Sequence, residues 1–167
     1  RRGQVERGRR TEAAGADAIH VSSYADASKG ESFTTAHTTH TPCGFVDCAA
    51  GIKAVVRIPV ITAGRIEPEV GDRLIRQGRI DFVAMGRKLL ADPELPRKVR
   101  EGRAQEIRPC IYCYTCISQI FVNRSVICAV NARTGREFET VITPAERPRR
   151  ILIAGGGPAG MEAARVA

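Results

Sequence analysis

The chain has 167 residues, a net charge of +8 at neutral pH and 43 % hydrophobic residues, enough for one ordinary domain. It has no apolar run as long as the roughly 18 residues of a membrane span, so we expect no membrane-spanning helix. The positive charge is compatible with a polyanionic partner. Because the arginines are scattered with little aromatic interleaving, we expect instead a solvated surface with a few phosphate ligands, and no nucleic-acid partner.

The ends of the chain resemble interior sequence of a longer protein. It begins at Arg1 without Met, and its last residues, GGGPAGMEAARVA, stop inside what the pattern predicts to be the first helix of a nucleotide-binding fold. We therefore expect an internal segment of a multidomain protein. Its six cysteines, four of them clustered, favour a metal site in a reducing cytoplasm over a disulfide framework.

The first third of the chain predicts a helix, a strand and a long loop. Residues 4–14 are expected to be helical, and the β-rich run 18–23 to be a buried strand in which His20 is a packed core residue. Residues 24–44 are polar, rich in Thr and Gly, and without periodicity, which predicts a loop. Loops of that length in compact domains are usually functional.

The next segments alternate between amphipathic helices and apolar strands. Such alternation is typical of parallel β/α units. Cys48 is expected in the core of the first of these helices, and Cys43 is expected to be a loop thiol before it. We expect helices over residues 44–56, 68–78 and 92–102, and strands that lie within residues 57–66 and 79–90.

Both of these strands end in the same dipeptide, Gly64-Arg65 in one and Gly86-Arg87 in the other. In a β/α barrel the ligand lies at the carboxyl ends of the strands, and the last two strands commonly form a phosphate site. Glycine lets backbone N–H groups approach a ligand, and arginine supplies a planar, permanently charged fork. We therefore expect these residues to bind phosphate, with surface ion pairs as the alternative.

Four cysteines have the spacing of an iron–sulfur ligand set. Cys110, Cys113 and Cys116 lie within seven residues, and Cys128 follows after eleven more. Three thiolates so close together can hold one side of a [4Fe–4S] cluster, and the fourth completes the site. Structural zinc, which usually takes two separated C-x2-C pairs, is the main alternative, and disulfides are the other.

The last residues predict a nucleotide-binding loop. After a linker with prolines and mixed charge, residues 151–153 are expected to form a buried strand that leads into G-x-G-x-x-G and a helix. The glycines permit a tight turn, the approach of a pyrophosphate and close helix packing. A tight turn that binds nothing is the alternative. The loop residues are Gly155, Gly156, Gly157, Pro158, Ala159 and Gly160.

The chain resembles flavin oxidoreductases related to bacterial 2,4-dienoyl-CoA reductase and trimethylamine dehydrogenase. The resemblance lies in four runs that occur in this order: VITAGRI, FVAMGRKLLADPELPRKVREG, CIYCYTCISQIF and ILIAGGGPAGMEAARVA. Those enzymes are similar to Old Yellow Enzyme in their FMN-binding barrel, and add a [4Fe–4S] site and a second nucleotide-binding region. The resemblance implies an α/β chain with three parts. They are the C-terminal portion of a (β/α)8 TIM barrel (1–105), a cluster segment and linker (106–147), and the start of a Rossmann-like FAD/NAD(P)-binding domain (148–167).

The same resemblance assigns cofactors to residues. Gly64, Arg65, Gly86 and Arg87 would contact the FMN phosphate, the four clustered cysteines would ligate the [4Fe–4S] cluster, and the loop 155–160 would lie against the pyrophosphate of FAD or ADP. The implied reaction passes electrons from NAD(P)H through FAD and the cluster to FMN. FMN then reduces an activated C=C bond of a small substrate, an unsaturated thioester or enoate.

Three alternatives to this activity remain open. The first is an amine dehydrogenase of the trimethylamine dehydrogenase type, with electrons entering at FMN, because the cysteine spacing has features of both branches. The others are a basic zinc module that binds nucleic acid and a ferredoxin-like electron carrier.

No catalytic residue is assigned from the sequence. The dienoyl-CoA reductases place a catalytic His in the loop after the sixth barrel strand, and their catalytic Tyr would precede residue 1. Here His37 and His40 lie in that loop, away from the aligned position, near which Ser28 and Lys29 are found.

Overall fold

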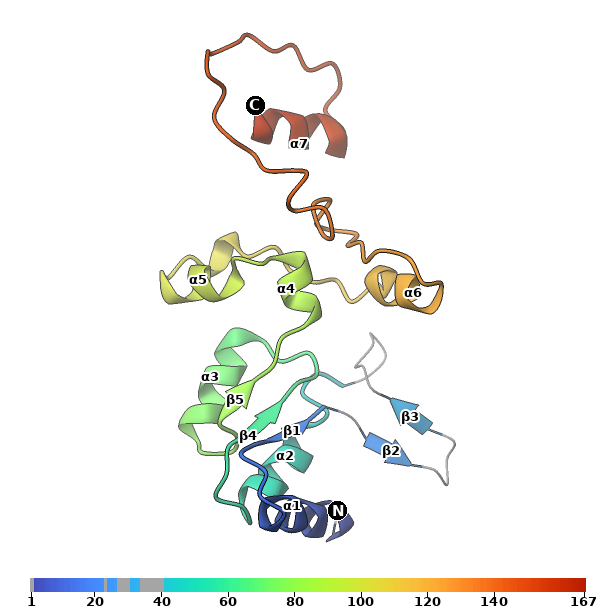
Figure 1. The fold of residues 1–167 in the computed structure, drawn as a ribbon. Helices are drawn as coiled ribbons and strands as arrows, with labels where there is room; N and C mark the ends of the chain where they lie inside the picture. Colours follow the sequence, from blue (N-terminus) through green and yellow to red (C-terminus); the bar gives the residue numbers. More distant parts are fainter. Residues whose placement is uncertain (1, 23, 27–30, 34–40) are drawn as a thin grey trace. The chain divides into compact units, whose positions relative to one another are not determined.

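The computed structural model describes the chain except residues 1, 23, 27–30 and 34–40 (Figure 1). The chain forms two compact units, residues 1–134 and residues 135–167. Each unit is described by itself. Within the described part of the chain, every helix is too short or too polar to cross a bilayer.

The first unit is built on a three-stranded parallel sheet in the order β1-β4-β5. Its strands are β1 (Ile19–Val21), β4 (Val60–Thr62) and β5 (Phe82–Val83). The helices that alternate with them are α1 (Arg2–Ala13), α2 (Val46–Lys53), α3 (Pro68–Arg76) and α4 (Arg87–Ala91). The predicted parallel β/α units are therefore confirmed, as is the α/β class of this unit.

One face of the sheet packs against helices, and the other is open. Val21, Val60 and Val83 belong to the core cluster, which also contains the buried residues of α2 and α3. Neighbours along the strands point to the opposite face, since successive side chains of a strand alternate. There His20 and Phe82 are exposed, Phe82 by 56 %. The prediction that His20 is a packed core residue is wrong, because the register places it opposite the helix-covered face.

The core helix α2 buries one face. Its buried residues are Val46, Ala49 and Ile52, and Phe45 is buried directly before it. Cys48 is half-buried against this core.

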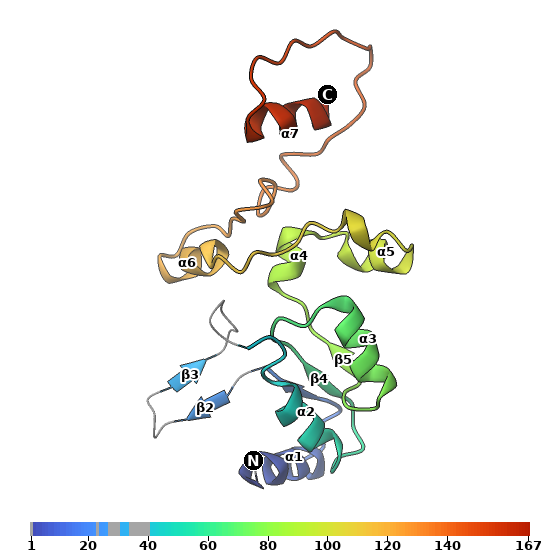
Figure 2. The ribbon, with the colours of Figure 1, turned by 180° about the vertical axis from the view of Figure 1, so that it is seen from behind.

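The segment between β1 and α2 contains a hairpin that the sequence did not predict. Strands β2 (Tyr24–Asp26) and β3 (Glu31–Phe33) pair antiparallel and lie apart from the parallel sheet in both views (Figures 1 and 2). Strands of three residues are too short to show a two-residue period in a polar sequence, so 24–44 was expected to be a loop throughout. The residues considered for proton transfer lie outside the described residues: Ser28, Lys29, His37 and His40.

Three short elements follow the sheet. They are α5 (Leu95–Arg100), the 3-10 helix η2 (Ala104–Glu106) and α6 (Thr115–Phe121). Helix α5 occupies only the second half of the predicted 92–102, because Pro96 in its first turn favours a start there. Helix α6, within the cysteine segment, was not predicted.

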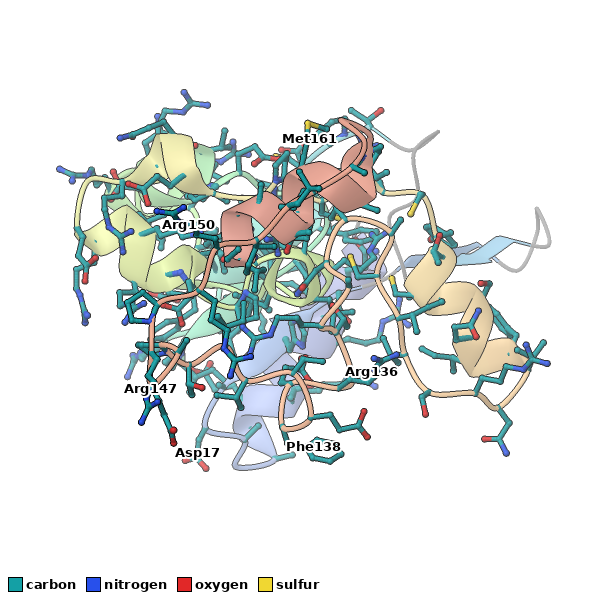
Figure 3. The ribbon with its side chains drawn as sticks, turned by 90° about the horizontal axis from the view of Figure 1, so that it is seen from above. Asp17, Arg136, Phe138, Arg147, Arg150 and Met161 are labelled. Atoms are coloured by element: carbon teal, nitrogen blue, oxygen red, sulfur yellow. The ribbon has the colours of Figure 1, made fainter. Side chains whose placement is uncertain are left out.

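The second unit contains one helix, α7 (Pro158–Val166), at the place where the glycine loop predicted it. The predicted strand 151–153 is not formed, and Ile151 and Leu152 are 61 % and 95 % exposed. A strand needs a neighbour for its backbone hydrogen bonds, and the described residues of this unit provide none. The preceding linker is also exposed, with the side chains of Arg136, Phe138, Arg147 and Arg150 among those drawn in Figure 3.

Candidate cofactor-binding site

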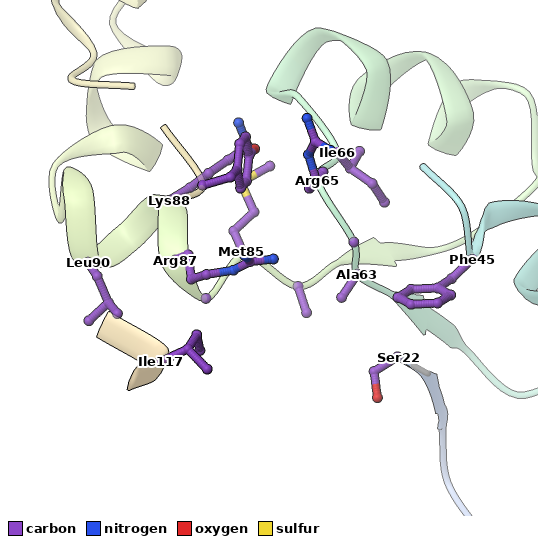
Figure 4. A pocket seen from close by; sticks show the side chains of 14 residues that line it. Ser22, Phe45, Ala63, Arg65, Ile66, Met85, Arg87, Lys88, Leu90 and Ile117 are labelled. Atoms are coloured by element: carbon purple, nitrogen blue, oxygen red, sulfur yellow. The ribbon is translucent and has the colours of Figure 1, made fainter. Parts of the chain in front are cut away.

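The two Gly-Arg pairs meet at one edge of the parallel sheet. Thr62 of β4 pairs with Val83 of β5, so both strands end on the same side, and each pair follows its strand within four residues. A pocket of about 400 Å³ contains all four residues of the pairs (Figure 4). Cofactor pockets in proteins have such volumes, so the structure brings together the residues predicted to bind phosphate.

Gly64 is the residue that lets the chain turn at this point. Its φ is +104°, in the region that favours glycine, and a Cβ there would lie 2.7 Å from the Phe45 ring. Arg65, the next residue, also has a positive φ of 56°. The sharp turn after β4 therefore sets where the Arg65 side chain leaves the backbone.

A tyrosine from the cysteine segment lies against both arginines. The guanidinium carbon of Arg65 is 4.5 Å from the centre of the Tyr112 ring, and that of Arg87 is 5.3 Å from it. Arg87 also lies 5.1 Å from the ring centre of Tyr114. Cations over an aromatic face are attracted by the ring quadrupole, so these rings hold the arginines in the pocket.

A third cation completes this group. Lys88 is buried, and its Nζ lies 5.6 Å from the Tyr112 ring centre. The same Nζ is 2.5 Å from Glu67 Oε2. The Tyr112 hydroxyl donates a 3.4 Å hydrogen bond to Glu67. Burial alone would lower the pKa of Lys88, but the hydrogen bonds with Glu67 and Tyr112 outweigh it and raise the pKa. Lys88 is therefore charged at neutral pH. With Arg65 and Arg87, the group has three cations and one carboxylate.

All six cysteines are free thiols, and four of them line a second pocket, together with Arg87, Tyr112 and Tyr114. The backbone between the first three is unusual, because Tyr112 and Tyr114 have φ of +54° and +65°. Left-handed residues on both sides of Cys113 reverse the chain twice and turn neighbouring cysteines to the same pocket. The four cysteines are Cys110, Cys113, Cys116 and Cys128.

The described residues contain no ready-made site for a single metal ion. Among the described residues, no three His, Cys, Asp or Glu side chains surround one point closely enough to hold an ion. A [4Fe–4S] cluster presents its four irons at different corners, so its cysteines must stand further apart than the ligands of one tetrahedral zinc. Four free thiols that line one pocket are the donor set that such a cluster takes.

Two of the thiols have shifted pKa values. Hydrogen bonding with the Thr115 side chain, at 3.2 Å, and with its backbone lowers the pKa of Cys113. Burial raises the pKa of Cys116, and the charge of Arg87 acts in the opposite direction. The thiolate is the form that binds metal. The Cys113 thiol therefore reaches this form more readily than the Cys116 thiol.

The segment before the cysteines is tied to the end of α4 by a buried carboxylate. Asp92 accepts hydrogen bonds of 2.7 Å from Lys98 Nζ and 2.8 Å from the backbone N–H of Arg108, two residues before Cys110. Only 4 % of its side chain is exposed. Burial would raise the pKa of Asp92, but these contacts outweigh it and lower the pKa.

The segment after the cysteines is tied to the same helix. The carbonyl of Leu90 accepts hydrogen bonds of 2.9 Å from Asn131 Nδ2 and 2.8 Å from Thr134 Oγ1. Both Asn131 and Thr134 are buried. The two ends of the cysteine segment therefore meet on α4, the helix that begins with Arg87.

In the second unit, the glycines of the predicted loop have different surroundings. Gly155 has a φ of +116°, and a Cβ on Gly160 would lie 1.9 Å from the carbonyl oxygen of Gly155. These two positions require glycine for the loop itself. A Cβ on Gly156 or Gly157 meets nothing within 4 Å. The open side of the loop thus lies at the two positions where a pyrophosphate is expected to approach.

The sequence analysis missed three parts of this site: the tyrosines of CIYCYTC, Lys88 with its partner Glu67, and Asp92. The alternation of Tyr with Cys was a visible pattern, and Lys88 follows Gly86-Arg87 directly. Asp92 had no such pattern, because its partners lie 6 and 16 residues further along the chain.

The model of the NADH:flavin oxidoreductase / NADH oxidase family matches residues 6–106. The chain is 51 % identical to an NADH oxidase of Thermoanaerobacter brockii and 48 % identical to a cinnamate reductase of Clostridium sporogenes, in each case over 70 % of its own length. It also superposes on 2-naphthoyl-CoA reductase in complex with 2-naphthoyl-CoA, with a TM-score of 0.83 and 33 % identity over 98 % of the chain. Other relatives are named as amine dehydrogenases.

The chain spans only part of these proteins. It covers 18 % of the length of the NADH oxidase and of the cinnamate reductase, and 25 % of the 2-naphthoyl-CoA reductase chain.

The buried carboxylate gives a prediction about pH. Asp92→Asn in the complete enzyme should lower the free energy of unfolding at pH 7 by about 3–5 kcal/mol, because Lys98 loses its buried partner. The folded-state pKa of Asp92 is depressed, so its contribution is present above the unfolded value of about 3.9 and lost as pH falls through the folded value. Thermal midpoints of wild type and variant should therefore converge below about pH 4.

Asp72→Asn is the matched control, since Asp72 pairs with Arg76 on an exposed helix face at 2.8 Å. It should cost about 0.5 kcal/mol or less at any pH. An equal effect of the two substitutions would contradict the anchoring role of Asp92.

Proposed function

Because this chain belongs to the NADH:flavin oxidoreductase / NADH oxidase family, we propose that it supplies the phosphate end of an FMN site and the ligands of a [4Fe–4S] cluster. The enzyme that contains it reduces an activated C=C bond in a small unsaturated thioester or enoate. One observation carries this proposal. The two Gly-Arg strand ends share one pocket, and the four-cysteine pocket adjoins it, with Arg87 and Tyr112 lining both.

The charge of the first pocket supports a phosphate ligand. Arg65, Arg87 and Lys88 bring three positive charges around one ring, and Glu67 neutralises one of them. A phosphate monoester carries about −1.5 to −2 at pH 7, which matches the remaining two. The arginines offer fork-shaped donors for its oxygens, and the backbone is open at Gly86, where a Cβ would meet nothing within 4 Å.

The chain also holds the features needed for electron transfer between cofactors. In this proposal, electrons from NAD(P)H reach the C=C bond through FAD, the cluster and FMN, which supply the redox chemistry when they are bound. The chain's own residues position these groups: the Gly-Arg pairs hold the flavin phosphate, the cysteines hold the cluster, and the loop 155–160 receives a pyrophosphate. Relatives named for cinnamate and for 2-naphthoyl-CoA support an enoate or thioester as the substrate class.

An amine dehydrogenase is the second candidate, supported by relatives with that name. The cofactors would then be the same, but electrons would enter at FMN and leave through the cluster. Assays of the complete enzyme with an enoate, an enoyl thioester and secondary or tertiary amines separate the two. Reduction of the C=C bond with NAD(P)H supports the first proposal, and amine oxidation without it supports the second. Family membership argues against the zinc module that binds nucleic acid.

The FMN phosphate site predicts the effect of removing its arginines. Arg65→Ala and Arg87→Ala should each weaken FMN binding to the complete enzyme by about 1.5–3 kcal/mol, since each removes a charge-assisted contact with phosphate. The measurement is quenching of flavin fluorescence when FMN is titrated into flavin-free enzyme. Arg76→Ala, at an exposed helix position, is the control and should bind FMN as wild type does. Wild-type affinity in both site variants would show that these residues do not hold the flavin.

The cysteine pocket predicts a cluster of four irons. Enzyme purified without oxygen should be brown and contain close to four irons and four sulfides per chain, as the cluster formula requires. Cys113→Ser should lose the cluster and uncouple NAD(P)H oxidation from substrate reduction. Cys48→Ser, in the core helix α2, should retain the iron. Stoichiometric zinc in place of iron would refute the cluster.

The glycine loop predicts a separate nucleotide site. Gly157→Val should abolish FAD binding, because the added side chain occupies the open side of the loop, where the pyrophosphate must approach. The position has room for a side chain, so the loop itself should remain folded. Chromatography of the released flavins should then show FMN without FAD, and NAD(P)H-driven turnover should disappear. Retention of FAD would show that this loop does not bind it.

A further inference from the structure

Two residues, Arg87 and Tyr112, line both the Gly-Arg pocket and the cysteine pocket. Arg65, the equivalent arginine of the neighbouring strand, lines only the first. Both arginines therefore line the Gly-Arg pocket, and of the two only Arg87 also lines the cysteine pocket.

We propose that Arg87, held by Tyr112, couples the two sites electrostatically, so that binding of the FMN phosphate lowers the reduction potential of the cluster. This inference rests on the proposed function. A positive charge beside the cysteines favours the more negative, reduced cluster, because net charge near a cluster sets its potential. A phosphate bound to the same guanidinium offsets that charge. The cluster thus becomes a stronger reductant when FMN is in place.

The geometry around Tyr112 supports its positioning role. Its backbone lies between Cys110 and Cys113 in a left-handed conformation with φ of +54° that a bulky residue rarely adopts. Its ring meets the guanidiniums of Arg65 and Arg87 at 4.5 and 5.3 Å. A residue in such a conformation at a junction is a reason to look for a function, and here its ring lines both pockets.

The coupling is reciprocal by linkage. If bound FMN lowers the potential of the cluster, then reduction of the cluster must weaken the binding of FMN by the corresponding factor. The contact shared by the two cofactors is the guanidinium of Arg87.

The test compares the two arginines in the complete enzyme. Arg65→Gln and Arg87→Gln should each weaken FMN binding about 10- to 100-fold. In flavin-free enzyme, the cluster potential, from a redox titration followed by electron paramagnetic resonance, should fall in Arg87→Gln and stay at the wild-type value in Arg65→Gln. Arg87→Lys, which keeps the charge, should restore most of the potential but only part of the affinity, since the fork is lost.

Tyr112 is tested by a conservative and a disruptive substitution. Tyr112→Phe keeps the aromatic face and should bind FMN about as wild type does. Tyr112→Leu should bind it about 10-fold more weakly with its iron content unchanged. Equal FMN affinity of the leucine variant and wild type would overturn the role of the ring.

A second measurement needs no substitution. Adding FMN to flavin-free wild type should lower the cluster potential, and adding riboflavin, which lacks the phosphate, until the protein is yellow should leave it unchanged. An unchanged potential with FMN, or an equal potential in Arg87→Gln and Arg65→Gln, overturns the coupling while the phosphate site stands. Wild-type FMN affinity in both arginine variants refutes the phosphate site itself.

Discussion

The parallel pairing of β4 with β5 is the constraint on which the site depends. It aligns Thr62 with Val83, and so brings the two Gly-Arg pairs, which are 22 residues apart in sequence, to the same edge of the sheet. Without that register the two guanidiniums could not face one pocket. The helix-covered face of the sheet holds the register, because a slip of one residue would turn Val60 and Val83 away from the core.

The site is extended from this edge by one short helix. Helix α4 starts at Arg87 in the pocket, and its last carbonyls and Asp92 bind the segments before and after the cysteines. The anchors are buried, and those made by Asp92 are also charge-assisted, so they are stronger than exposed contacts. They also explain how the cysteine segment keeps one conformation although Tyr112 and Tyr114 are left-handed. Both ends of this segment are hydrogen-bonded to α4 and Asp92.

Much of this site could be predicted from the sequence, because its elements carry local patterns. The repeated Gly-Arg ends and the cysteine spacing are such patterns, and the structure places each set in one pocket. The parts of the site that were not predicted depend on contacts between residues that are far apart in the sequence. The ring of Tyr112 meets Arg65, 47 residues earlier in the sequence. The error at His20 has a similar cause, since hydrophobic neighbours in sequence do not reveal which face of a strand the helices cover. The strand expected over 151–153 depends on partner strands that the described residues do not include.

The side chain at position 112 affects both the strained backbone and the neighbouring cations. A glycine there would remove the cost of the positive φ, about 1–3 kcal/mol for a non-glycine residue. A tyrosine brings that cost but places an aromatic face against Arg65, Arg87 and Lys88, each contact worth about 0.5–2 kcal/mol. The three contacts together offset the strain. The ring also gathers cations that repel one another, and Glu67 is paired with one of the three, Lys88. One side chain therefore links the strained cysteine segment to the cations of the neighbouring pocket.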